Sequence, residues 1–119
     1  MKDYTLKFEN TLREVKLLID RFGQDYHVVE AYVYGSYANN THGSKSDLDI
    51  FLVIDTDYCR DSNNKRSIRN FIHNILYNPD IMEVEVDVHV APADDWEQDN
   101  SNILIDQVRR KGRLIWQRS

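Results

Sequence analysis

The stretch MEVEVDVHVA, residues 82–91, constrains the fold more than any other part of the sequence. Valine occupies every second position from Val84 to Val90, and the positions between are acidic or histidine. Side chains alternate between the two faces of a β-strand, so the pattern predicts a strand with one apolar and one polar face. The apolar face must be covered, which indicates a sheet with helices packed against it.

The other apolar patterns predict helices and strands that alternate along one domain, residues 1–119. A chain of 119 residues is long enough for a single hydrophobic core. We therefore expect an α/β (α+β) fold, with a small mixed sheet, helices on one face and an open acidic site on the other. The expected helices are 4–22, 62–78 and 101–111 with a short helical turn at 92–97, and the other expected strands are 28–34, 48–54 and 113–117.

Charge and composition exclude several classes of protein. The formal net charge of −5 argues against a general nucleic-acid-binding surface. No apolar run approaches the roughly 20 residues of a membrane span, and the first ten residues lack the apolar core of a secretory signal. Cys59 is the single cysteine, so an internal disulfide is impossible. A free thiol fits a reducing compartment, and we expect a cytoplasmic protein.

Three carboxylates fall on the predicted polar faces. Asp47 and Asp49 lie on one side of the strand at 48–54, and Asp87 lies on the polar side of the strand at 82–91. If these strands are neighbours, the three side chains converge on one face of the sheet. Carboxylates held together repel one another and favour a hard cation such as Mg²⁺. The pair Asp47 and Asp49 could then bridge two metal ions, with Asp87 completing the shell of one.

A second motif, Gly35-Ser36, stands at the end of the strand at 28–34. Glycine allows a phosphate to approach the backbone, and Ser36 is a candidate cap for a short helix whose free N–H groups favour an anion. Lys45, in the loop that follows, is a candidate phosphate ligand. These residues therefore predict binding of a nucleotide's phosphates beside its metal ions.

At these positions the chain resembles the DNA polymerase β-like nucleotidyltransferase superfamily. The shared signature is Gly-Ser, a gap of about ten residues, Asp-x-Asp in a strand, and a third acidic residue in a later strand. Here these are Gly35-Ser36, Asp47-Leu48-Asp49 and Asp87. The short length and the order of elements look most like the minimal nucleotidyltransferase (MNT) branch. One departure is Asn39-Asn40, where many members carry Arg-Gly.

The resemblance implies transfer of a nucleoside monophosphate, AMP from ATP, to a hydroxyl group. Two Mg²⁺ ions, or Mn²⁺, would assist, with Asp47, Asp49 and Asp87 as ligands. Many MNT proteins are antitoxins paired with HEPN-domain toxins, which makes a HEPN-domain protein the expected partner. Two alternatives stay open: transfer to a small-molecule hydroxyl, as in antibiotic modification, and an inactive module that silences a partner by contact. The cations Lys65, Arg66 and Arg69 are expected on a solvated helix face, with partner contact as the lesser alternative.

Overall fold

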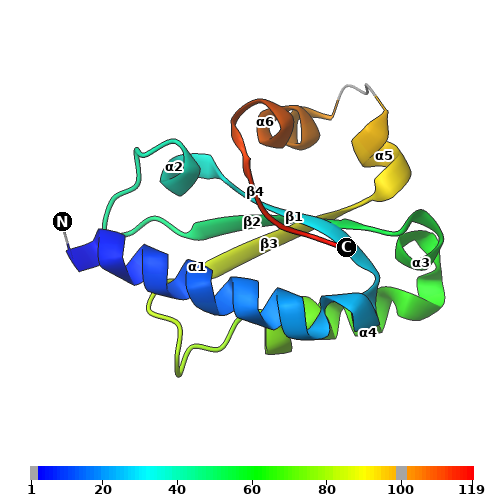
Figure 1. The fold of residues 1–119 in the computed structure, drawn as a ribbon, viewed down its shortest axis with the longest axis horizontal. Helices are drawn as coiled ribbons and strands as arrows, with labels where there is room; N and C mark the ends of the chain where they lie inside the picture. Colours follow the sequence, from blue (N-terminus) through cyan, green and yellow to red (C-terminus); the bar gives the residue numbers. More distant parts are fainter. Residues whose placement is uncertain (1–2, 99–101) are drawn as a thin grey trace.

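A mixed four-stranded sheet forms the centre of the computed structural model, which describes residues 3–98 and 102–119 (Figure 1). The strand order is β3-β2-β1-β4. Strand β1 is antiparallel to both β2 and β4, whereas β3 runs parallel to β2. The predicted mixed sheet is therefore confirmed. The strands are β1 (Val28–Tyr34), β2 (Leu48–Ile54), β3 (Val86–Pro92) and β4 (Arg113–Gln117).

Helices lie on both sides of this sheet. In Figure 1, α1 and α4 lie below the sheet, while α2, α5 and α6 lie above it. None of the helices in the described residues is long and apolar enough to cross a membrane. The helices are α1 (Asp3–Phe22), α2 (Gly35–Ala38), α3 (Thr56–Arg60), α4 (Lys65–Asn70), α5 (Ala93–Glu97) and α6 (Ile103–Lys111), with shorter or wider turns at η1 (Gly23–Tyr26), η2 (Ser62–Asn64) and η3 (Phe71–Ile75).

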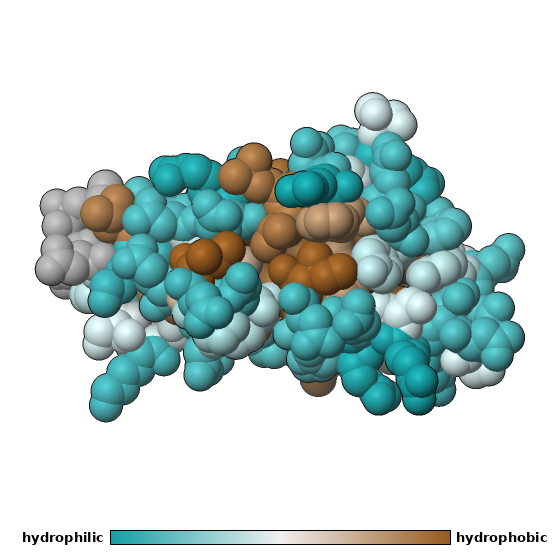
Figure 2. Space-filling view, turned by 90° about the horizontal axis from the view of Figure 1, so that it is seen from below, coloured by the Kyte–Doolittle hydropathy of each residue, from teal (hydrophilic) through white to brown (hydrophobic). Residues whose placement is uncertain are grey.

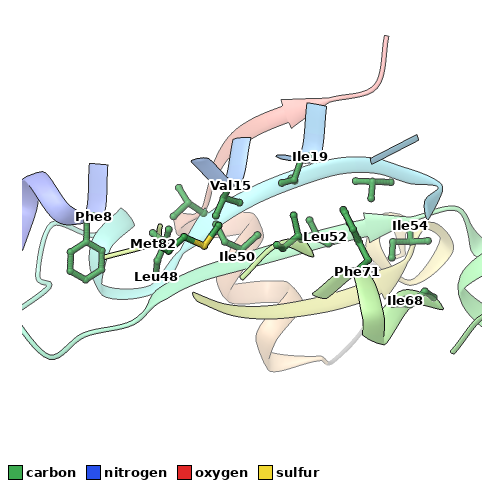
Figure 3. Close-up of a cluster of buried hydrophobic side chains, with 14 residues drawn as sticks. Phe8, Val15, Ile19, Leu48, Ile50, Leu52, Ile54, Ile68, Phe71 and Met82 are labelled. Carbon is green, nitrogen blue, oxygen red and sulfur yellow. The ribbon is translucent and has the colours of Figure 1, made fainter. Parts of the chain in front are cut away.

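The main core lies between the sheet and the lower helices. The even-numbered side chains of β2 all point into it, as the alternation predicts (Figure 3). Complete burial of each aliphatic side chain contributes about 1.5–3 kcal/mol, so this layer holds α1 and α4 against the sheet. On the face seen from below, some apolar surface still shows between polar side chains (Figure 2). Fully buried members include Phe8, Val15, Ile19, Leu48, Ile50, Leu52, Ile54 and Phe71.

A smaller core covers part of the other face. Phe51 and Val53 of β2 pack there with Ile105 and Val108 of α6, and Trp96 of α5 joins them. The acids predicted for this face lie at the opposite end of β2, beyond Phe51. The acidic face is thus open at one end and covered by α5 and α6 at the other.

The helix expected at 62–78 is interrupted by a wide turn at η3, where Leu76 N donates to Phe71 O over 2.9 Å. Residues five apart lie about 140° apart around an α-helix, but come closer to the same side in this wider turn. Phe71 and Leu76 are consequently both fully buried. The short helix α3 was not predicted.

Strand β3 is shorter than the stretch that predicted it. It begins at Val86 rather than Met82, because its neighbour β2 begins at Leu48, the register partner of Val86. The residues before Val86 turn toward α1, where Glu83 N donates to Thr11 Oγ1 over 3.1 Å.

Candidate functional site

The candidate site is a row of polar side chains that crosses three strands. Tyr34 of β1 is the register partner of Asp49 in β2, and Asp49 is the register partner of Asp87 in β3. Side chains of register partners point to the same face of a sheet. The parallel pairing of β2 and β3 therefore brings together two acids that are 38 residues apart in the sequence.

The electrostatics of this row are dominated by negative charge. Partial burial of Asp49, followed by the charges of Asp87 and Asp47, raises its pKa to about 6, although His89 acts in the opposite direction. Burial, and then the charges of Asp49 and Asp87, also raise the pKa of Tyr34, so its hydroxyl stays protonated. His89 Nε2 lies 3.3 Å from Asp87 Oδ2. The His89 imidazole is thus in hydrogen-bonding distance of one acid of the row, Asp87.

Asp47 stands immediately before β2 and is exposed. Its charge acts on Asp49, but within the described residues no group of three His, Cys, Asp or Glu side chains is gathered tightly enough to hold a metal ion. The structure thus places Asp49 and Asp87 in register on adjacent strands, whereas Asp47 lies one position before the start of β2. The negative charges gathered around Asp49 would still attract a divalent cation, which would lower the free energy of the ionised carboxylates.

Gly35 contacts Asp49 directly, a relation that sequence reasoning missed. Its backbone has φ +75°, in the left-handed region. A Cβ atom at this position would lie 2.2 Å from Asp49 Oδ2 and 3.1 Å from Asp49 Cγ. The Asp49 carboxylate therefore occupies the space that a side chain at position 35 would fill. This contact links the Gly-Ser motif to the Asp-x-Asp motif physically.

The turn after Gly35 differs from the expected capped helix. Helix α2 begins at Gly35, with Tyr34 in the cap position and no side-chain cap hydrogen bond, so the prediction that Ser36 caps it was wrong. The backbone carbonyl of Ser36 instead accepts from Thr41 N over 2.8 Å. Within the described part of the chain, no hydrogen bond involves the Ser36 hydroxyl. That hydroxyl can therefore serve a ligand.

His42 anchors the loop between the two motifs onto α1. Its ring lies edge-on to Phe8 at 4.8 Å and to Tyr37 at 5.0 Å between centroids, and its Nε2 lies 3.1 Å from Thr5 Oγ1. Its Nδ1 is buried and has no hydrogen-bond partner among the described residues. A lone histidine in a polar loop gave no sequence signal for this role, because its aromatic partners lie on other elements.

Lys45 lies in the same loop and is exposed. It lines a surface hollow together with Asp47, Glu83 and Glu85, and the described residues form no ion pair with it. Its ammonium group is thus available to a ligand beside Asp47. The role of Lys45 as a phosphate ligand stays a prediction.

The sequence matches the nucleotidyltransferase domain family over residues 15–111. Among curated proteins, none matches significantly. The fold is similar to that of a Sulfolobus solfataricus protein assigned as a nucleotidyltransferase, with a TM-score of 0.58 and 16% identity over 99% of this chain and 91% of the other.

Two further structures with this fold are toxin–antitoxin structures. One, with AMP-PNP, has a TM-score of 0.53 and 20% identity over 87% of this chain and 74% of the other. The second is an MntA-HpeT mutant, with a TM-score of 0.52 and 19% identity over the same shares, 87% and 74%. The family match spans most of the sequence and the neighbours share its fold: this chain belongs to the nucleotidyltransferase domain family.

Proposed function

We propose that this protein transfers AMP from ATP to a hydroxyl group of a partner protein, as an MNT-type antitoxin acting on a HEPN-domain toxin. The observation that carries the proposal is the contact of Gly35 with Asp49, which is itself in register with Asp87. The turn of the Gly-Ser motif and the two acids therefore meet at one point, in a chain of the nucleotidyltransferase family.

The reaction is an in-line displacement at the α-phosphorus of ATP. The acceptor oxygen forms a bond to phosphorus, the bond to the bridging oxygen breaks, and pyrophosphate leaves. Asp87 is exposed on an outer strand of the sheet and, in this proposal, receives the proton of the acceptor hydroxyl. Gly35, Ser36 and Lys45 hold the β- and γ-phosphates.

Asp47, Asp49 and Asp87 would hold Mg²⁺, or Mn²⁺, in two positions. When bound, the metal supplies positive charge that stabilises the attacking and leaving oxygens. Burial, and then the charges of Asp87 and Asp47, raise the pKa of Asp49, and a bound cation would favour its ionised form. No side chain of the protein has to be modified covalently.

The choice of a protein acceptor is supported by the fold neighbours. Two of them are toxin–antitoxin structures, one solved with AMP-PNP. The other carries two aspartate-to-glutamate changes two positions apart, which is the spacing of Asp47 and Asp49 in this chain.

The experiment incubates the protein with the product of the adjacent gene, ATP and Mg²⁺, and measures the mass of the intact partner. Addition of one or more AMP units is expected, and Asp87→Ala should abolish it. Glu85→Ala is the matched control, because Glu85 is also exposed and lies two residues earlier in the sequence. Modification should persist in this control.

Two outcomes would contradict the proposal. If the partner is inhibited equally by wild type and by Asp87→Ala without gaining mass, the protein is a contact inhibitor and not an enzyme on that partner. If the partner is neither modified nor inhibited, transfer to a small-molecule hydroxyl becomes the better explanation of the site.

A further inference from the structure

A hollow of about 280 Å³ lies beside β3, between this strand and the helical segments α3, α4 and η3. Its floor is apolar and includes Ile68, Ile72 and Val90. Val90 points to the face of β3 opposite to Asp87 and His89, because side chains alternate along the strand. The hollow and the acidic site are therefore on the two sides of the same strand.

The rim of this hollow is basic. Lys65, Arg69 and His73 line it and are exposed. Lys65 and Arg69, four residues apart, lie along one side of α4, and His73 follows in η3. Among the described residues, none of those lining this hollow is acidic. This basic rim is local, since the whole chain has a net charge of −5.

The cations on the rim are also without partners. Within the described ranges, no ion pair or side-chain hydrogen bond involves Lys65, Arg69 or His73, whereas Arg60 pairs with Asp94 at 2.8 Å and Arg118 with Asp55 at 2.8 Å. The charges on Lys65 and Arg69 are therefore free to meet an external carboxylate.

Strand β3, which contributes Val90 to the hollow, is an outer strand of the sheet. Among the strands in the described residues, it is hydrogen-bonded to β2 alone. A partner that fills the hollow would thus reach around this edge toward Asp87, which lies on the other side of β3.

We infer that this hollow docks an acidic amphipathic segment of the protein acceptor: apolar side chains contact Ile68, Ile72 and Val90, and carboxylates meet Lys65 and Arg69. The inference rests on the proposed function, since it assigns that site's acceptor a place to bind. An apolar floor suits a peptide segment better than a phosphate backbone, which favours protein over nucleic acid.

A second groove provides the natural comparison. It lies along α1 and β4, and its charged lining combines Glu9 and Asp20 with Arg13 and Lys16. Because the charged lining has equal numbers of acidic and basic residues, it favours neither an acidic nor a basic partner. Exposed cations on α1 therefore serve as matched controls for those on the rim.

The experiment makes two measurements of binding to the product of the adjacent gene. The first is the dissociation constant between that partner and the Lys65→Glu/Arg69→Glu variant, with the Lys7→Glu/Lys16→Glu variant as the control. All four residues are exposed, so both variants should keep the wild-type melting temperature. Reversal of two interfacial charges should weaken binding at least about tenfold, whereas the control should stay within about twofold.

The second readout uses Cys59, which lines the hollow and is the single cysteine. A thiol-reactive photo-crosslinker on Cys59 should capture the partner. The same reagent on Cys59→Ser/Lys16→Cys, in the second groove, should not.

The results separate this inference from the proposed function. Equal binding by both charge variants, or crosslinking from position 16 instead of Cys59, overturns the docking site even if AMP transfer occurs. Crosslinking at Cys59 with no added mass on the partner supports the docking site while the proposed function fails. Capture of single-stranded RNA through Lys65 and Arg69, with no capture of the protein, would also overturn the inference.

Discussion

Replacement of Gly35 by alanine tests whether the two motifs are joined through a single contact. With φ +75°, an alanine at this position carries a backbone strain of about 1–2 kcal/mol. Its Cβ would also lie 2.2 Å from Asp49 Oδ2, so the carboxylate must leave its rotamer at a cost of about 1 kcal/mol. The expected loss is about 2–3 kcal/mol, or roughly 8–12 °C in melting temperature.

A double-mutant cycle isolates the part that belongs to Asp49. In an Asp49→Ala background the carboxylate is absent, so Gly35→Ala should cost only the backbone strain, about 1 kcal/mol less than in the wild type. Unfolding in urea measures each of the four free energies. Gly43→Ala is the control, since a Cβ at Gly43 would meet no atom within 4 Å. Equal costs in both backgrounds would refute the contact as the reason for glycine.

Three further outcomes are expected. Asp49→Asn should raise the free energy of unfolding at pH 8 by about 1 kcal/mol after solvent screening. The folded-state pKa of Asp49 is raised from 3.8 to about 6, so the wild type loses stability as pH rises through that range and the difference should vanish near pH 4; a constant difference would contradict this. Mg²⁺ with ATP together should raise the melting temperature more than either alone, and no shift at millimolar concentrations would count against the site. Asn102→Ala should lower the free energy of unfolding by about 1 kcal/mol, because the Asn102 side chain accepts a hydrogen bond from Ile105 N at the start of α6. An unchanged melting temperature would show that this cap does not stabilise the helix.

Strand positions were predictable because alternation and β-branched residues act locally. The strands expected at 28–34, 48–54 and 113–117 have the bounds of β1, β2 and β4. The prediction that the strand at 82–91 includes residues 82–85 was wrong, because the length of a strand depends on where its neighbour begins. Likewise, the wide turn at η3 depends on two buried side chains, Phe71 and Leu76, whose common direction is set by the core.

The sequence predicted which residues belong to the candidate site, but not which of them touch one another. Asp49 and Asp87 could be placed on polar faces by periodicity, yet their pairing requires the register of β3 against β2. The contact between Gly35 and Asp49 also depends on the antiparallel register of β1 and β2. Such registers arise from packing between distant segments, and a single sequence carries no local signal for them.

The position of Asp87 on an outer strand has a consequence for solubility. Strand β3 is rich in valine, and its free edge could pair with the same edge of another molecule and begin aggregation. A charged side chain on an edge strand opposes such pairing by repulsion between copies. Asp87 therefore also protects the sheet, and its replacement by alanine removes that protection together with the acid. Purified Asp87→Ala would then self-associate more than the wild type at high concentration, and a substitution to lysine would keep association at the wild-type level without restoring the carboxylate.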